Sequence, residues 1–202
     1  GKRRPQMPLV IEENFTAVLL EQLRANELDV VIVAQPIDLQ GLQAWPVYDE
    51  PFVALLPPDH RWSTEAAIPS KKLAEEKLLL LGPGHCFRDQ VIEACPKCID
   101  PDSEGPRPHT GSSLETIRHM VASGLGLTVV PRSSVEDRPD VPTLLVSRPL
   151  AKPEPSRRIV LAWRKTFPRA KAVATLRSAI LDSGMKGVQF IPQAQAESGA
   201  QE

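Results

Sequence analysis

Short apolar runs alternate with more polar segments along most of the chain. The runs have the length and the leucine or β-branched content of buried strands, and they cover 28–34, 52–56, 77–81, 125–130 and 157–163. The intervening segments predict helices over 14–24, 70–76, 85–95, 112–123 and 168–182. Strands that alternate with helices indicate an α/β fold with a largely parallel sheet.

Local signals predict where several of these elements begin and end. Asn14 is suited to cap the first helix. Ser112 with Glu115 three residues later has the pattern of a capping box, and Gly124 suits the position just after that helix. The segment 96–111 is rich in Pro, Gly, Asp and Ser and is expected to be a loop.

The end of the chain is polar. We expect it to be frayed from Gly184 onward, and residues 191–202 to form a disordered tail.

Composition narrows the class of protein. The 202 residues suffice for one large domain or two small ones, and 42% hydrophobic with 24% charged residues is an ordinary globular mixture. The 24 Lys and Arg against 25 Asp and Glu give a net charge of −1, which argues against nucleic-acid binding by this chain itself. No apolar run approaches the roughly 20 residues of a membrane span, and no secretory signal opens the chain, so we expect no membrane partner.

The cysteines point to a reducing compartment. There are three, an odd number, and they occur only between 86 and 98. This pattern excludes a secreted disulfide scaffold.

Cys86 is the candidate reactive residue. It follows the turn Gly82-Pro83-Gly84 and begins a predicted helix, where the partial positive charge of the helix terminus stabilises a thiolate. His85 and Arg88 are near enough in sequence to add positive potential. Peroxide oxidises a thiolate to sulfenic acid, which a second thiol converts to a disulfide. The alternative is that Cys86 is a small buried hydrophobic residue.

Cys95 lies nine residues after Cys86, on the same predicted helix. Nine helical steps separate the two residues by about 13.5 Å along the axis and place them on opposite faces. A disulfide needs Cα atoms within about 7 Å of each other. An intact helix therefore forbids a Cys86–Cys95 bond, and forming that bond would unwind or rearrange the helix, as a redox switch requires.

Cys98 completes a C-x-x-C spacing with Cys95. By itself this spacing is weak evidence for a redox dithiol or for half of a zinc site. His109 is a possible third ligand, but no fourth is suitably spaced, so we expect neither a metal nor another cofactor. Cys98 is then a bystander or a reserve resolving thiol.

The run 84–90, Gly-His-Cys-Phe-Arg-Asp-Gln, followed by Cys95, resembles the redox segment of the peroxide-sensing members of the LysR-type transcription regulators. Other stretches resemble the same family in the same order: 28–32, 49–51, 73–79, 113–116, 120–124 and 152–155. The resemblance covers about residues 7–183.

The resemblance implies a fold like that of type II periplasmic binding proteins, in which two Rossmann-like α/β subdomains are joined by two crossover strands. Subdomain I would comprise 1–49 and 154–190, and subdomain II would comprise 50–153 with the cysteines. We recognise no counterpart of the family's winged helix-turn-helix, of its linker helix or of the first strand of its regulatory domain. Without that strand we expect an exposed sheet edge.

The resemblance also assigns roles to residues. It implies that Cys86 reacts with peroxide and that Cys95 resolves the product as a disulfide. Around the thiol, where they would orient peroxide, it places His85, Arg88, Asp89, Thr16 and Gly84. Purely structural roles are the alternative: a hydroxyl at a helix terminus for Thr16, and a solvated surface pair for Arg88 and Asp89.

The implied function is that of the regulatory domain of a cytoplasmic bacterial transcription regulator. Peroxide oxidation of Cys86 would lead to the Cys86–Cys95 disulfide, rearrange the helix and the oligomer interface, change DNA binding and activate antioxidant genes. The partners would be hydrogen peroxide, further copies in a dimer or tetramer, promoter DNA through a separate N-terminal domain, RNA polymerase and a cellular thiol reductant. The candidates for the contact between copies are Glu115, Arg118, His119 and Ser123, whereas Ile117 and Met120 are core by default.

Two other classes of function stay open. A metabolite-binding domain would carry convergent polar groups in the cleft between the subdomains. A thiol peroxidase would need rapid turnover and a reductant. The large rearrangement suits a switch better than a catalyst, so we expect no enzyme.

Overall fold

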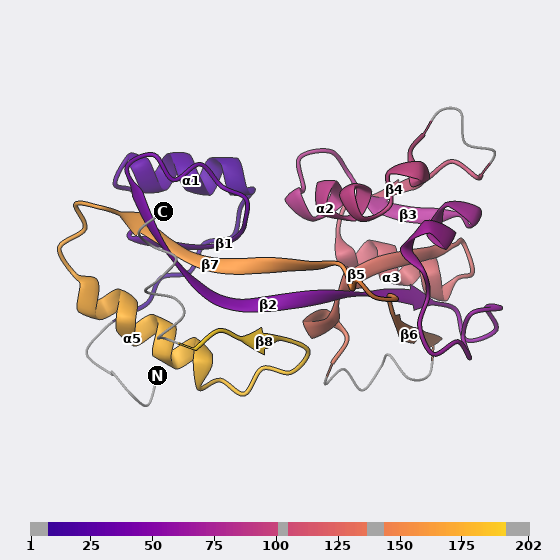
Figure 1. Ribbon diagram of the computed structural model, residues 1–202. Helices are drawn as coiled ribbons and strands as arrows, with labels where there is room; N and C mark the ends of the chain where they lie inside the picture. The colour runs from indigo at the N-terminus through magenta and orange to yellow at the C-terminus, as the bar shows by residue number, and fades with distance from the viewer. Residues whose placement is uncertain (1–7, 101–104, 137–143, 193–202) are drawn as a thin grey trace.

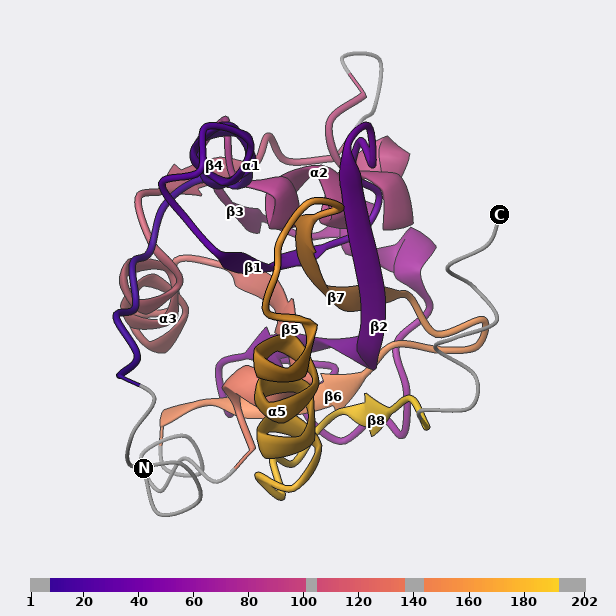
Figure 2. The same ribbon diagram turned by 90° about the vertical axis from the view of Figure 1, so that its left-hand side faces the viewer.

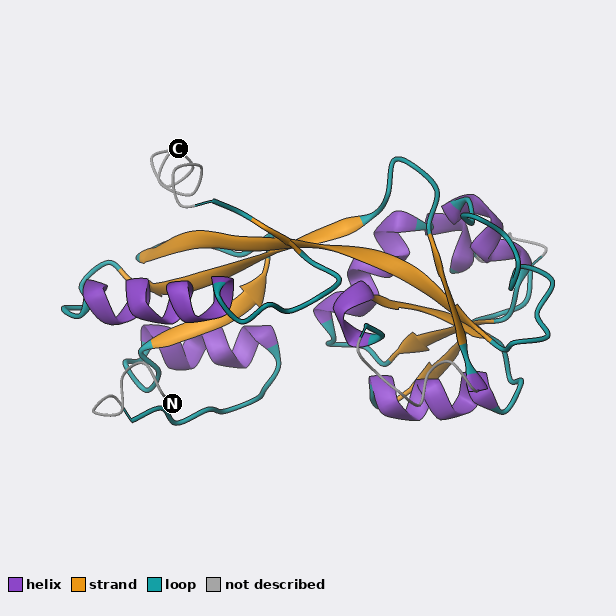
Figure 3. Cartoon of the chain, turned by 90° about the horizontal axis from the view of Figure 1, so that it is seen from below, coloured by secondary structure: helices purple, strands orange, loops and turns teal. Residues whose placement is uncertain are grey.

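The computed structural model describes residues 8–100, 105–136 and 144–192, and it has two α/β halves lying side by side (Figure 1). The long strand β2 (Leu42–Leu56) belongs to both. Its first part pairs with β7 (Ser156–Arg164), and its last part pairs with β5 (Leu127–Pro131). The chain returns to the first half between β6 (Val146–Pro149) and β7 (Figure 1), and Figure 3 shows strands running between the two halves. These two crossings confirm the expected two-subdomain fold.

The first half has a sheet between two helices. The sheet contains β1 (Val30–Ala34), β7, the first part of β2 and the short β8 (Gln189–Phe190), and its faces are covered by α1 (Thr16–Arg24) and α5 (Ala170–Leu181) (Figure 2). Successive residues of β7 point to opposite faces, as in any strand. Val160 and Ala162 therefore pack in the core on the α1 side, whereas Leu161 and Trp163 pack in the core on the α5 side.

The second half contains the cysteines. Its remaining elements are β3 (Leu78–Leu81), β4 (His109–Gly111), the helices α2 (Cys86–Ala94) and α3 (Leu114–Ala122), and the 3-10 turns η1 (Ser70–Glu75), η2 (Pro96–Cys98) and η3 (Arg132–Ser134). All four residues of β3 are buried, and α2 and α3 both pack against this strand. One continuous core joins these elements and includes Cys95 and Cys98.

The expectation of a largely parallel sheet is wrong. Among the strand pairs of the described residues, only β3–β4 and β3–β5 are parallel, and all the other ladders are antiparallel. A parallel pair needs a long crossover connection. Here α2 and α3 provide it between β3, β4 and β5, whereas β1 is followed by β2 through a connection without a helix.

The helix α3 is capped one residue later than expected. Its N-cap is Ser113 rather than Ser112, because the Ser113 hydroxyl accepts a hydrogen bond from the Thr116 backbone N–H at 3.1 Å. At the other end Gly124 has φ +73°, and its N–H donates to the carbonyl of Val121 while the next N–H donates to that of Met120. This is the expected glycine termination.

Asn14 does not cap the first helix as expected, because α1 begins at Thr16 with Phe15 as its N-cap and no side-chain cap. Other boundaries also differ from the sequence expectations. The predicted helix over 70–76 is the 3-10 turn η1, and residues 42–51 extend the predicted strand 52–56 into the long β2. The segment after Gly184 is not frayed throughout, because β8 pairs with Tyr48 and Asp49 of β2. Ile191 is buried and donates its N–H to Val47, whereas 193–202, the rest of the expected tail, lie outside the described residues.

Strand β1 ends the strand order at one side of the sheet, and Ile32 on it is half exposed. The described strands thus leave the exposed edge that we expected. None of the helices in the described ranges is both long enough and apolar enough to cross a membrane.

Candidate functional site: the cysteine helix

Cys86 is the first residue of α2, as the sequence predicts. His85 is the N-cap residue, and Gly84 before it adopts φ +93°, a left-handed conformation that suits glycine. The Cys86 side chain is partly exposed and carries a free thiol. The unpaired N–H groups of the first helical turn give this terminus its partial positive charge. Cys86 is therefore open to a small oxidant at a position that favours negative charge on sulfur.

The N-terminal ends of α1 and α2 meet beside Cys86. The Phe15 ring, at the N-cap of α1, contacts the His85 ring edge-on with 5.0 Å between centroids. A Cβ at Gly84 would lie 3.8 Å from the same phenyl ring. Thr16 follows Phe15 as the first residue of α1. The structure thus brings Thr16, Gly84 and His85 to one junction between the two halves of the molecule.

Arg88 and Asp89 are not a surface ion pair. The Arg88 guanidinium donates from Nη1 to the carbonyl of Leu81, the last residue of β3, at 2.8 Å. The salt bridges among the described residues include none between Arg88 and Asp89. Asp89 lies in the first turn of α2, where the helix dipole favours a negative charge. Arg88 therefore ties the start of α2 to the sheet.

Two other contacts that hold α2 in place have no local signal in the sequence. The Gln90 side-chain amide donates to the carbonyl of Gln35 in the first half, at 3.3 Å. Phe87 is buried edge-on against Phe52, and the Arg157 guanidinium carbon lies over the Phe87 ring, 5.1 Å from its centroid. Glutamine and phenylalanine occur on helices in many roles, so only the tertiary packing shows that Gln90 and Phe87 hold α2 against the rest of the molecule.

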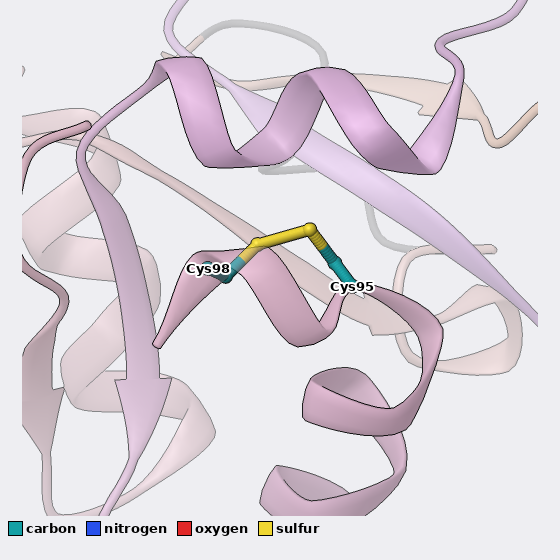
Figure 4. Close-up of a disulfide and its surroundings, with 2 residues drawn as sticks. All are labelled: Cys95 and Cys98. Carbon is teal, nitrogen blue, oxygen red and sulfur yellow. A yellow bond between two sulfur atoms is a disulfide. The ribbon is translucent and has the colours of Figure 1, made fainter. Parts of the chain in front are cut away.

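Cys95 and Cys98 form a disulfide in this structure, with their Cα atoms 5.7 Å apart (Figure 4). Cys95 ends α2 as its C-cap, and Cys98 ends the short turn η2. The turn is closed by a hydrogen bond from the Cys98 N–H to the Cys95 carbonyl at 3.0 Å. Cys98 is thus neither a bystander nor half of a metal site here: it is the bonded partner of Cys95 while α2 is intact.

A cavity of about 130 Å³ lies beside this disulfide. Cys98 lines it together with the charged residues Arg88, Lys97, Asp100 and Arg107. Cys95 and Cys98 are both buried, and of the two only Cys98 is in the cavity lining.

The residues expected at a contact between copies differ in exposure. Glu115, His119 and Ser123 are exposed on one face of α3, at helical spacing. Arg118 differs from this expectation: it is buried, and its guanidinium donates to the carbonyl of Ser134 in its own chain. Ile117 lies in the core and Met120 packs against it, as expected from the sequence.

A second cavity, of about 370 Å³, lies wholly within the first half of the molecule. It is lined by residues of 8–12, 27–30 and 167–176. It is not the polar cleft between subdomains that a metabolite-binding domain would need.

Known proteins resemble this chain over most of its length. It is 36% identical to a protein named "Probable hydrogen peroxide-inducible genes activator" from Streptomyces viridosporus, over 89% of this chain and 58% of that protein. It therefore spans little more than half of this longer relative.

Solved structures show the same likeness. The reduced form of the OxyR regulatory domain from Pseudomonas aeruginosa is 47% identical, with a TM-score of 0.79 over 89% of this chain and 85% of that one. A reduced form of OxyR from N. meningitidis is 40% identical, with a TM-score of 0.82 over 93% of this chain and 86% of that one. Residues 1–184 match the LysR substrate binding domain, and the chain belongs to that family.

Proposed function

We propose that this chain is the peroxide-sensing regulatory domain of an OxyR-like transcription activator. The Cys86 thiolate attacks one oxygen of hydrogen peroxide and becomes sulfenic acid, while the other oxygen leaves as hydroxide and is protonated to water. The Cys95 thiol then attacks the Cys86 sulfur, and the Cys86–Cys95 disulfide forms with release of a second water. The names of the similar proteins support peroxide as the signal. The whole regulator would add a DNA-binding domain and act in the bacterial cytoplasm, on promoter DNA and with RNA polymerase.

The observation that carries the proposal is the placement of the two cysteines at opposite ends of α2. Cys86 begins the helix and is partly exposed, whereas Cys95 ends it and is buried. The helix holds the two residues about 13.5 Å apart along its axis. The Cys86–Cys95 disulfide therefore cannot form until α2 opens.

Opening α2 has a definite energetic cost. Phe87 and Val91 on the helix are 5% and 2% exposed, and both would leave the core. Exposing two such side chains costs about 3–6 kcal/mol. The Arg88–Leu81 and Gln90–Gln35 hydrogen bonds would break as well, and the second of these joins the two halves of the molecule. Oxidation would thus change both local packing and the contact between the halves.

The proposed readout is a change in packing between copies of the regulator. The exposed α3 face with Glu115, His119 and Ser123 is the surface that we propose for the contact between copies. An opened α2 would alter this assembly in a dimer or tetramer and so move the attached DNA-binding domains. A cellular thiol reductant would return the switch to its starting state.

A switch and a thiol peroxidase differ in stoichiometry. Titrating the fully reduced chain with peroxide should consume about one peroxide per chain, and samples trapped early should contain mainly the Cys86–Cys95 linkage. Hydrogen exchange should show that the amides of α2 lose protection in these samples. Continued peroxide consumption with a thiol reductant and an intact α2 would instead indicate an enzyme, and a Cys86 that stays reduced would refute the proposal.

A further inference from the structure

The chain contains two mutually exclusive disulfides, because Cys95 can be bonded either to Cys86 or to Cys98. The structure shows the second bond with α2 intact. We infer that Cys98 is a second resolving thiol: it displaces Cys86 from the Cys86–Cys95 disulfide by bonding to Cys95, and the helix α2 then forms again. This inference rests on the proposed function, since the disulfide that Cys98 attacks is the product of the peroxide reaction.

The step is a thiol–disulfide exchange. The Cys98 thiolate attacks the Cys95 sulfur, the Cys95–Cys98 bond forms, and the Cys86–Cys95 bond breaks with the electron pair leaving on the Cys86 sulfur. One disulfide is consumed and one is made, so no further oxidant or reductant is required. Cys86 returns to the thiolate state, and the two electrons taken up by peroxide come in the end from Cys95 and Cys98.

Geometry favours the attack. Cys98 is three residues from Cys95, and in the folded structure their Cα atoms are 5.7 Å apart, within the range of an ordinary disulfide. The short turn η2 that holds them is closed by a hydrogen bond of its own, from the Cys98 N–H to the Cys95 carbonyl. Cys98 also lines a cavity with Arg88, Lys97 and Asp100, so its side of the turn adjoins open space.

Packing gives the exchange its direction. The Cys86–Cys95 bond forbids the helix, whereas the Cys95–Cys98 bond is present with Phe87 and Val91 buried in the core. Exchange therefore restores the buried surface that the first disulfide removes. The end product has the conformation of the reduced domain, but its Cys86 has no resolving partner. Peroxide could still oxidise Cys86 to sulfenic acid, but the Cys86–Cys95 disulfide should not form again until an external thiol reduces the Cys95–Cys98 bond.

Peptide mapping resolves the three cysteines cleanly. Trypsin cleaves after Lys77, Arg88 and Lys97, so Cys86 falls in peptide 78–88, Cys95 in 89–97, and Cys98 begins a third peptide. We would treat the reduced 202-residue chain with one equivalent of peroxide, trap thiols at successive times with an alkylating agent at low pH, and digest without reductant. The variants C98S and C86S would be treated in parallel.

We call the transfer of Cys95 from Cys86 to Cys98 the relay. It predicts the order in which the two disulfides appear. In the unaltered chain the Cys86–Cys95 link, between peptides 78–88 and 89–97, should appear first. It should then decay as the Cys95–Cys98 link increases, without added reductant. In C98S the first link should persist at least about ten times longer, because the attacking thiol is missing. In C86S the Cys95–Cys98 link should form at least about ten times more slowly, because the thiol that reacts with peroxide is missing.

Different failures have different meanings. If C98S accumulates the Cys86–Cys95 link and the unaltered chain keeps that same link to the end, the relay is wrong and the peroxide switch stands. If C86S forms the Cys95–Cys98 link as fast as the unaltered chain, peroxide oxidises that pair directly and the relay is again wrong. If even C98S never links Cys86 to Cys95, the proposed function itself fails, and the relay with it.

Discussion

The packing of α2 should set the equilibrium between the reduced dithiol and the Cys86–Cys95 disulfide, and Val91→Ala tests this directly. Val91 is 2% exposed in the core of the second half. Its replacement removes two buried methyl groups, about 0.8 kcal/mol each, and leaves a small cavity, while the better helix propensity of alanine returns about 0.6 kcal/mol. The folded helix should lose about 1.5 kcal/mol.

Only the form with an intact α2 bears this loss. In the Cys86–Cys95 form the helix is open and Val91 no longer packs in the core, so the substitution leaves that form nearly unchanged. Because about 1.4 kcal/mol corresponds to a factor of ten, the ratio of disulfide to dithiol should rise about tenfold at a given glutathione potential. Urea unfolding of the reduced chain should show the same loss of about 1.5 kcal/mol.

The assay is equilibration in glutathione buffers of graded potential, followed by acid quenching and quantification of the linked peptides. Cys98→Ser is present throughout, so that the second disulfide does not compete. Val121→Ala is the matched control: it is a fully buried valine on α3, in the same core. It should lower the free energy of unfolding similarly without moving the redox ratio. An unchanged ratio for Val91→Ala, or an equal shift for the control, would refute the coupling between α2 packing and oxidation.

Three other predictions concern the scaffold. Glu50 is buried and forms a salt bridge with Arg157 at 2.6 Å, so in urea unfolding Glu50→Gln should lower the free energy of unfolding by about 3 kcal/mol. Asp49→Asn, in the more exposed pair with Arg158, should lower it by about 0.5 kcal/mol. A Cβ at Gly126 would lie 2.2 Å from a backbone oxygen, whereas one at Gly124 meets nothing within 4 Å; Gly126→Ala should therefore lower the melting temperature much more than Gly124→Ala, which costs about 1 kcal/mol. Burial, and next the charge of Glu50, raise the pKa of Tyr48 above 10.0. Since the unfolded state then deprotonates first, stability should be fully present below about pH 10 and fall as the pH rises toward the folded pKa. Tyr48 is the only tyrosine, so its phenolate absorbance measures that pKa, and a midpoint at or below 10.0 would contradict the argument.

Much of the site follows from local sequence. The glycine turn before Cys86 and the helix after it are visible as a turn and a helical segment, and the structure places α2 at Cys86–Ala94. The nine-residue spacing to Cys95 already determines that a helix keeps the two thiols apart. These inferences hold because turn residues and helical geometry act over a few neighbouring residues.

Partners far along the chain were not predictable in the same way. The Phe15–His85 and Gln90–Gln35 contacts join segments about seventy and fifty-five residues apart, and none of these side chains carries a local pattern that names its partner. Arginine is usually a surface residue, yet Arg118 is buried and donates a hydrogen bond to the carbonyl of Ser134 in η3. Such contacts depend on how the sheet and helices pack.

The sequence alone determined the positions of most strands and helices, the position of Cys86 at the start of a helix and the conflict between an intact α2 and a Cys86–Cys95 bond. Only the tertiary structure decided which strands run antiparallel, that the ends of α1 and α2 meet, and that Cys98 holds Cys95. The physical reason is that periodicity and turn chemistry are encoded over a few residues, whereas strand direction and side-chain partners are selected by burial of the whole core.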